Sequence, residues 1–187
     1  MFYGIDVREY GSGNAGATNT FRVLGKKAGI PVLLIDILKG YAAVQVPYLT
    51  ELIPQSTPFV NLQLVLGVAA LFGHIFPLFA AFKGGKGIAT LLGIILAVHP
   101  YAALASIVVF LVVYLVSHYV SLGSITAALT FPILVTVVFK TQVTSLVIFS
   151  MVIAVLVLIT HQKNIERLLK REESKSRLIK RKSSNGL

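Results

Sequence analysis

The run VNLQLVLGVAALFGHIFPLFAAF, residues 60–82, decides the fold of this chain. It contains one ionisable side chain, His74, and it is long enough to cross a membrane, since a spanning helix needs about 20 predominantly apolar residues. Lipid offers no hydrogen-bond partner, so every backbone group of such a segment must be paired within the segment. The run therefore predicts a transmembrane helix.

Further apolar segments flank this run on both sides, at 30–49, 88–99, 101–117, 122–139 and 143–160. None alternates polar and apolar residues, as the strands of a transmembrane β-barrel would. The segment 88–99 is short, because twelve helical residues cover only about 18 Å. It must either borrow Gly85–Gly87 at its start or cross only part of the bilayer.

The composition agrees with lipid as the solvent of the chain. Of the 187 residues, 56 % are hydrophobic and 13 % are charged, whereas soluble domains carry roughly 25 % charged residues. The absence of cysteine excludes disulfides and thiolate metal sites. The sequence therefore predicts an all-α, polytopic integral membrane helix bundle with about six transmembrane helices.

Lysine and arginine are concentrated on alternate connections between the segments. Residues 1–29 and 83–87 are basic, nine of the 17 Lys and Arg lie between residues 163 and 182, and the connection 50–59 has none. By the positive-inside rule, the basic connections and the C-terminus face the cytoplasm. The predicted division is a transmembrane domain, 1–162, and a basic cytoplasmic tail, 163–187, whose last dozen residues form a surface helix on anionic lipid.

A glycine-rich stretch, GSGNAGATNTFR at 11–22, precedes the first segment. Its first six residues match the G-x-G-x-x-G of dinucleotide-binding loops, but no strand precedes it, and Asp36, at the expected acidic position, falls inside a span. Glycines still let backbone N–H groups approach an anion. Four polar side chains and a guanidinium accompany them: Ser12, Asn14, Thr18, Asn19 and Arg22. We interpret the stretch as a phosphate-binding loop; the alternative is a flexible, solvated loop.

A second glycine-rich loop lies in GHIFPLFAAFKGGKGIAT, residues 73–90. KGGKG places Lys83 and Lys86 around two glycines at the start of the next helix, where unpaired N–H groups favour anions. The alternative is a pair of lysines that only reach for the interface. His74 lies within the predicted span, where an ionisable side chain is either functional or a structural histidine that is hydrogen-bonded between helices. Asp36 and Lys39 are three residues apart on one helix face and can form an ion pair, which is either functional or only structural.

Two further polar stretches fall on the same predicted face of the membrane. SHYVSLGS, residues 117–124, joins two spans, and THQKNIERLLKREESK, residues 160–175, follows the last span. In the second stretch His161, Asn164 and Arg167 recur at helical spacing and share one face. That face leaves the membrane where the other three polar loops lie.

Together these motifs resemble the acyl-phosphate-dependent glycerol-3-phosphate acyltransferases of bacteria, the PlsY family. The resemblance rests on GSGNAGATNxxR, GHxFPxFxxFKGGKGxAT, a YVSLGS-type loop and HxxNIxRL, which occur in the family's order over nearly the whole chain. It implies seven transmembrane helices, of which the first is missing here, and an active site at the cytoplasmic face of the inner membrane. It also implies acyl transfer from acyl phosphate to the 1-hydroxyl of glycerol 3-phosphate, giving lysophosphatidic acid and phosphate, without acyl-CoA, cofactor, metal or nucleic acid.

The resemblance assigns roles to residues of the four motifs. Those implied to be catalytic are Ser12, Arg22, Lys83, Lys86, His161 and Asn164. Those implied to bind substrate are Gly13, Asn14, Thr18, Asn19, His74, Gly84, Gly85 and either or both of Ser121 and Ser124. Because acyl phosphate is already activated, no covalent nucleophile is needed, and either a substrate phosphate oxygen or His161 could take the hydroxyl proton.

This chain departs from the family at several peripheral positions. The family's last motif usually reads HRxNIxRLxxGxE, whereas Gln162 replaces its arginine and Arg171 stands near its glycine. His118 stands where an arginine is common.

The alternative function is a membrane transporter or channel with a cytoplasmic-face anion site, although the sequence has no internal repeat of the kind that many transporters show. A lipid-binding scaffold that uses the basic tail is the third hypothesis.

Overall fold

The computed structural model describes residues 3–176, and within that range the chain is helical and contains no strand. The α-helices are α1 (Ala17–Leu24), α2 (Lys26–Ala43), α3 (Thr57–Ile75), α4 (Ile88–Val98), α5 (Pro100–Ser117), α6 (Val120–Ile133), α7 (Thr144–Thr160) and α8 (Gln162–Leu169). Shorter turns are η1 (Val7–Glu9), η2 (Val46–Leu49), η3 (Leu78–Ala80) and the π-helical η4 (Leu134–Val138). The surface helix expected in the last dozen residues lies almost wholly outside the described residues.

Each predicted apolar segment forms a helix, which confirms the all-α membrane bundle. Three stretches are long and apolar enough to cross a membrane alone: Thr57–Ala80, Pro100–Ser117 and Val120–Val138. The pair α7 and α8 would make a fourth, bent by 61° at their junction. The short third segment is the eleven-residue helix α4, in agreement with the sequence.

Helix α3 ends earlier than the sequence predicted. The apolar run continues to Phe82, but the helix stops at Ile75 and the chain turns through η3. Pro77 explains the difference, because proline has no N–H for the helix and disfavours helical geometry at the residue before it. Phe76 accordingly leaves the helical region, with φ −121° and ψ 61°. The loop that carries KGGKG is therefore longer than expected.

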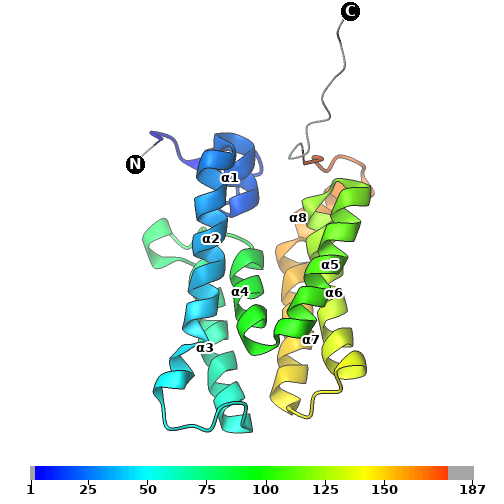
Figure 1. The fold of residues 1–187 in the computed structure, drawn as a ribbon. Helices are drawn as coiled ribbons and strands as arrows, with labels where there is room; N and C mark the ends of the chain where they lie inside the picture. The colour runs from blue at the N-terminus through cyan, green and yellow to red at the C-terminus, as the bar shows by residue number, and fades with distance from the viewer. Residues whose placement is uncertain (1–2, 177–187) are drawn as a thin grey trace, which may run out of the picture.

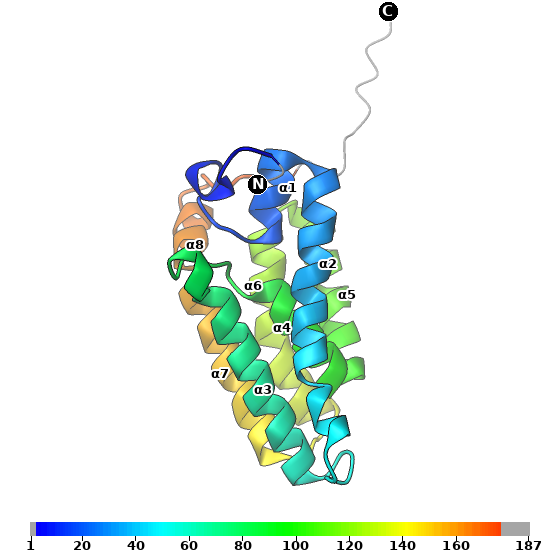
Figure 2. The ribbon, with the colours of Figure 1, turned by 90° about the vertical axis from the view of Figure 1, so that its left-hand side faces the viewer.

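Helix α4 lies in the middle of the bundle, between α2 and α3 on one side and α5, α6 and α7 on the other (Figure 1 and Figure 2). It packs backbone to backbone on α2. A Cβ added to Gly40 would lie 2.1 Å from the carbonyl oxygen of Thr90, and one added to Gly93 would lie 2.0 Å from that of Ile37. Small residues allow this close approach of membrane helices, and the contact fixes the start of α4 beside α2.

The polar motifs gather towards one end of the bundle. Helices α1 and α8 lie at the same end, and the connections 50–56 and 139–143 lie at the opposite end (Figure 1). Two helices begin with a side-chain cap: Ser56 accepts the N–H of Phe59 at the start of α3, and His99 accepts the N–H of Ala102 at the start of α5. The helices thus carry the motifs from distant parts of the chain to one region.

Candidate active site

The first glycine loop, residues 10–16, is shaped by a buried amide. Asn19, 2 % exposed, accepts the N–H of Ser12 at 2.8 Å and donates to the carbonyl oxygens of Val7 and Tyr10 at 2.7 and 3.0 Å. Gly11 has φ +63°, and a Cβ there would lie 2.4 Å from the side-chain oxygen of Asn19. The sequence assigned Asn19 to substrate binding, but both ends of its amide hold the loop.

The loop leads into the short helix α1. Asn14 accepts the N–H of Gly16 at 2.9 Å, and Gly16 precedes the first residue of the helix. This bond closes a turn and leaves Ser12, Gly13 and Asn14 along one side of a cavity. The spacing of glycines and small polar residues, which predicted an anion-binding loop, therefore produces a tight turn that presents Ser12 and Asn14 to the cavity.

The second glycine loop folds back on the end of α3. Gly84 donates its N–H to the carbonyl oxygen of Ile75, and Gly85 donates to that of His74. Neither position has room for a side chain, since a Cβ on Gly84 would lie 2.0 Å from the His74 carbonyl oxygen and one on Gly85 would lie 2.2 Å from its ring Nε2. Gly85 also touches Gly16, because the same Cβ would be 3.3 Å from the Gly16 Cα. The two glycine loops are thus in direct contact.

Lys86 is the residue at which the motifs converge. Its ammonium donates to the side-chain oxygen of Asn164, at the first turn of α8. Asn164 is 6 % exposed, and its amide nitrogen donates to Glu173 at 2.6 Å. Glu173 also accepts from Ser121 at 2.7 Å and from Arg167 at 2.8 Å. One carboxylate therefore links the second, third and fourth motifs.

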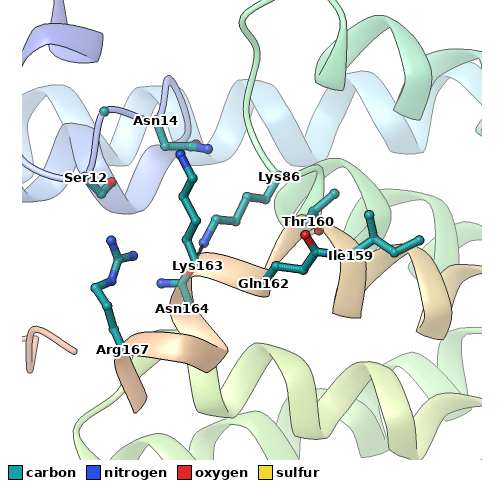
Figure 3. Close-up of a pocket in the computed structure, with 10 residues that line it drawn as sticks. Ser12, Asn14, Lys86, Ile159, Thr160, Gln162, Lys163, Asn164 and Arg167 are labelled. Atoms are coloured by element: carbon teal, nitrogen blue, oxygen red, sulfur yellow. Dashed lines mark hydrogen bonds between the residues drawn. The ribbon is translucent and has the colours of Figure 1, made fainter. Parts of the chain in front are cut away.

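A cavity of about 280 Å³ opens between the first glycine loop and α8 (Figure 3). Its lining residues are Ser12, Gly13, Asn14, Lys86, Ile159, Thr160, Gln162, Lys163, Asn164 and Arg167. In Figure 3 the side chains of Ser12 and Asn14 face Lys86, Asn164 and Arg167 across it. With three cationic side chains and no carboxylate in its lining, the cavity suits an anion such as phosphate.

His161 lies at the junction of α7 and α8, and its side chain is buried. Its exposed fraction is 3 %, and Nδ1 lies 2.9 Å from the carbonyl oxygen of Val157. A carbonyl oxygen only accepts, so Nδ1 carries the proton and Nε2 of the neutral ring is left as an acceptor. The structure also separates the two candidate serines: Ser121 reaches Glu173, whereas Ser124 donates to the backbone of its own helix at Val120.

Other predicted site residues lie outside the cavity lining. Lys83 is exposed on the second loop, Thr18 and Arg22 are exposed on α1, and His74 lies under Gly85. Arg22 is near enough for its charge to act on Lys86. The assignment of Lys83 and Thr18 to the site stays a prediction.

Sequence reasoning left out Arg167 and Glu173. Arg167 was recognised on the face of His161 and Asn164 but was not assigned, and it lines the cavity. Glu173 stands twelve residues after His161, where the quoted family motif has its glutamate. The acidic position of that motif was therefore the signal that could have found it. Glu166, seven residues earlier, is exposed and pairs only with Lys170 among the described residues.

Arg171 ends α8 in a strained conformation, and this predicts a stabilising substitution. Its φ is +60°, its N–H donates to Leu168, and the next N–H donates to Arg167, the pattern of a helix terminus that prefers glycine. We expect Arg171→Gly to raise the free energy of unfolding by about 1 kcal/mol in a detergent unfolding titration. Arg171→Ala, which removes the charge but keeps the strain, should give no gain, and equal stability of the two variants would contradict this explanation.

The comparisons with known proteins agree with this geometry. The sequence model of the family described as glycerol-3-phosphate acyltransferase matches residues 1–171. A glycerol-3-phosphate acyltransferase of Chlorobium phaeobacteroides (strain BS1) is 41 % identical over 203 aligned residues, which cover 94 % of this chain and 86 % of the relative. No group of three or more His, Cys, Asp or Glu side chains in residues 3–176 could hold a metal ion.

Two solved structures of a glycerol 3-phosphate acyltransferase also match this chain. The glycerol 3-phosphate form of PlsY (YgiH), an integral membrane glycerol 3-phosphate acyltransferase, matches with a TM-score of 0.81 and 39 % identity over 94 % of this chain and 84 % of that one. Its lysophosphatidic acid form matches with a TM-score of 0.76 and 39 % identity over 88 % and 80 % of the two chains. The chain therefore belongs to the glycerol-3-phosphate acyltransferase family.

Proposed function

We propose that this membrane-integral glycerol-3-phosphate acyltransferase moves an acyl group from acyl phosphate to the 1-hydroxyl of glycerol 3-phosphate at the Lys86 cavity. The products are lysophosphatidic acid and phosphate. The observation that carries the proposal is the partly buried ammonium of Lys86, which is held by Asn164 and faces Ser12 and Asn14. The family membership favours this hypothesis over a transporter or channel.

The cavity offers the groups that two phosphates require. Lys86, Lys163 and Arg167 supply positive charge, and the side chains of Ser12 and Asn14 supply neutral donors. Arg167 bonds Glu173 through Nε, and its two Nη atoms have no hydrogen-bond partner among residues 3–176. A guanidinium anchored on one edge in this way presents the other edge to a phosphate.

The chemistry needs positioning rather than a covalent intermediate. The glycerol hydroxyl oxygen forms a bond to the acyl carbonyl carbon, and the bond from that carbon to the phosphate oxygen breaks, so that phosphate leaves with the electron pair. Lys86 and Arg167 offset the charge that develops on the phosphate. A phosphate oxygen of the substrate or Nε2 of His161 takes the hydroxyl proton.

We place the acyltransferase part of the chain at residues 1–176 rather than 1–162. Asn164 and Arg167 line the cavity, Glu173 binds both, and the N–H of Ser176 donates to the carbonyl oxygen of His118. These contacts support a working role for α8 and the segment after it. The basic tail that the sequence placed from residue 163 then begins after Ser176.

The cavity end of the bundle faces the cytoplasm of the bacterial inner membrane in our proposal. Residues 1–29 and the C-terminal tail carry most of the Lys and Arg, and α1 and α8 lie at that end. The chain has no cysteine, so single cysteines report topology directly. Glu51→Cys should react with an impermeant maleimide in intact spheroplasts and Glu172→Cys only after lysis; the reverse pattern would contradict the orientation.

The donor is tested with the purified full chain in lipid nanodiscs and labelled glycerol 3-phosphate. Acyl phosphate, acyl-CoA and acyl carrier protein loaded with the same chain are supplied in parallel reactions. We expect labelled 1-acyl-glycerol 3-phosphate only with acyl phosphate. Equal product from acyl-CoA or acyl carrier protein would overturn the donor assignment, and no product from any donor would overturn the proposed function.

The pKa of Lys86 predicts a basic limb in the pH profile. Burial lowers the pKa of its ammonium to about 8, with Arg167 and Arg22 adding to the shift and Glu173 opposing it. Rising pH therefore removes the positive charge, so kcat/KM for glycerol 3-phosphate should fall above about pH 8. The guanidinium of Lys86→Arg stays charged, so the activity that this variant retains should not fall above about pH 8. The same fall in both proteins would assign the limb to another group.

A further inference from the structure

A cluster of ionisable side chains lies between α2 and α3, outside the cavity lining. The Lys39 ammonium donates to the Asp36 carboxylate at 2.6 Å, and it lies 2.5 Å from Nδ1 of His74. That Nδ1 is also 3.3 Å from the same carboxylate oxygen. The side chains of Asp36 and His74 are 10 % and 8 % exposed. Placing ionisable side chains at such depth costs free energy, so the cluster is a candidate for a functional role.

The contacts fix which part of the His74 ring faces the second glycine loop. An ammonium has only donors, so Nδ1 of His74 accepts from Lys39 and the ring proton is on Nε2. Nε2 is the atom that a Cβ on Gly85 would meet at 2.2 Å. The cluster therefore holds the ring by one edge, and the opposite edge packs against Gly85.

Gly85 in turn is in contact with the first glycine loop. The Cβ position that meets His74 on one side lies 3.3 Å from the Gly16 Cα on the other. Gly16 is anchored by Asn14, and Gly85 is followed by Lys86, so both contacts lead directly to residues that line the cavity. A shift of the His74 ring would change the distance between the two loops.

We propose that Asp36, Lys39 and His74 form a positioning network, which holds Gly85 against Gly16 and so sets Lys86 across the cavity from Ser12 and Asn14. None of the three touches substrate. His74, which the sequence assigned to substrate binding, acts through Gly85. The proposal rests on the proposed role of Lys86, and small displacements of such a group are costly, since catalysis depends on sub-ångström placement.

The test is a double-mutant cycle between His74 and Gly85. Gly85→Ala places a methyl group against the ring, and we expect it to lower kcat/KM about 30-fold or more, largely through KM for glycerol 3-phosphate. His74→Ala removes the support and should cost about tenfold. In the double variant the new methyl occupies the space that the ring left. Its kcat/KM should be at least about tenfold higher than the product of the two single effects predicts.

The adjacent glycine provides a matched control. A Cβ on Gly84 meets the backbone carbonyl oxygens of His74 and Ile75, at 2.0 and 2.6 Å, and His74→Ala leaves both in place. His74→Ala should therefore give no rescue of Gly84→Ala. A purely structural role for the cluster would lower the amount of folded protein in all variants without this selective coupling.

The cycle has outcomes that overturn the positioning network separately from the proposed function. Full activity of His74→Ala, or effects that multiply as if independent, would overturn it while leaving the Lys86 site intact. If the unmodified chain makes no lysophosphatidic acid from any donor, the same cycle is measured as Tm in nanodiscs. His74→Ala should then restore the Tm of Gly85→Ala but not of Gly84→Ala, and equal behaviour of the two glycines would reject the network.

Discussion

Lys86→Ala should lower kcat/KM for glycerol 3-phosphate by about a hundred- to a thousand-fold, the effect of removing one preorganised charged donor from an active site. The ammonium lies in the cavity, and it donates to the side-chain amide of Asn164 rather than to a carboxylate. Initial rates with labelled glycerol 3-phosphate and saturating acyl phosphate in nanodiscs measure the loss.

The Lys86→Ala protein should remain folded. Burial lowers the pKa of Lys86 to about 8, which means that its charge is less favourable in the folded chain than in water. Removing the charge should therefore leave Tm unchanged or raise it. Lys170→Ala is the matched control, because Lys170 is the C-cap of α8, the helix that carries Asn164, but is exposed and pairs with Glu166. Loss of activity in both variants, or in neither, would contradict the assignment of Lys86.

Glu173→Ala should destabilise the protein by about 3–5 kcal/mol and abolish turnover. The side chain of Glu173 is 7 % exposed and accepts hydrogen bonds from Ser121, Asn164 and Arg167. Its loss leaves a buried amide and hydroxyl without an acceptor and a guanidinium without its carboxylate, and each of these carries a desolvation cost. The free energy of unfolding in a denaturant titration measures the change.

The pKa of Glu173 adds a pH test to this prediction. Burial raises the pKa of the carboxyl, but the hydrogen bonds from Ser121, Asn164 and Arg167 outweigh burial and place it below its ordinary value. A lowered folded-state pKa contributes stability above the unfolded pKa and loses it as pH falls through the folded value. Stability should thus decline in acid less steeply in Glu173→Gln than in the unmodified chain.

Glu166→Ala is the matched control for Glu173→Ala. Because Glu166 belongs to an exposed pair, its substitution should leave both stability and activity unchanged. A comparable loss in Glu166→Ala would contradict the special role of Glu173.

The helices were predictable because their signal is local. Long apolar runs give α3, α5 and α7 directly, since lipid leaves the backbone no other solution. The early end of α3 was also present in the sequence, in Pro77, but the apolar run through Phe82 outweighed it. The helices α1 and α8 fall in polar stretches, where the length of an apolar run gives no information; only the helical spacing of His161, Asn164 and Arg167 indicated α8.

The site was predictable as a set of loops rather than as a set of contacts. Glycine spacing and basic residues identified both anion loops, yet no local pattern shows that Asn19 holds its own loop while Asn164 reaches Lys86. Glu173 escaped notice because an acidic residue in a basic stretch resembles a surface residue until its three donors are known. His74 was found by its depth in the membrane, but its contact with Gly85 depends on where α3 ends.

The most direct test of the Lys86 cavity as the substrate site is equilibrium binding of labelled glycerol 3-phosphate to the full chain in nanodiscs, with no acyl donor present. We expect saturable binding of one molecule per chain, competed by inorganic phosphate, lost in Lys86→Ala and retained in Lys170→Ala. Equal binding by the unmodified chain and Lys86→Ala would contradict the account.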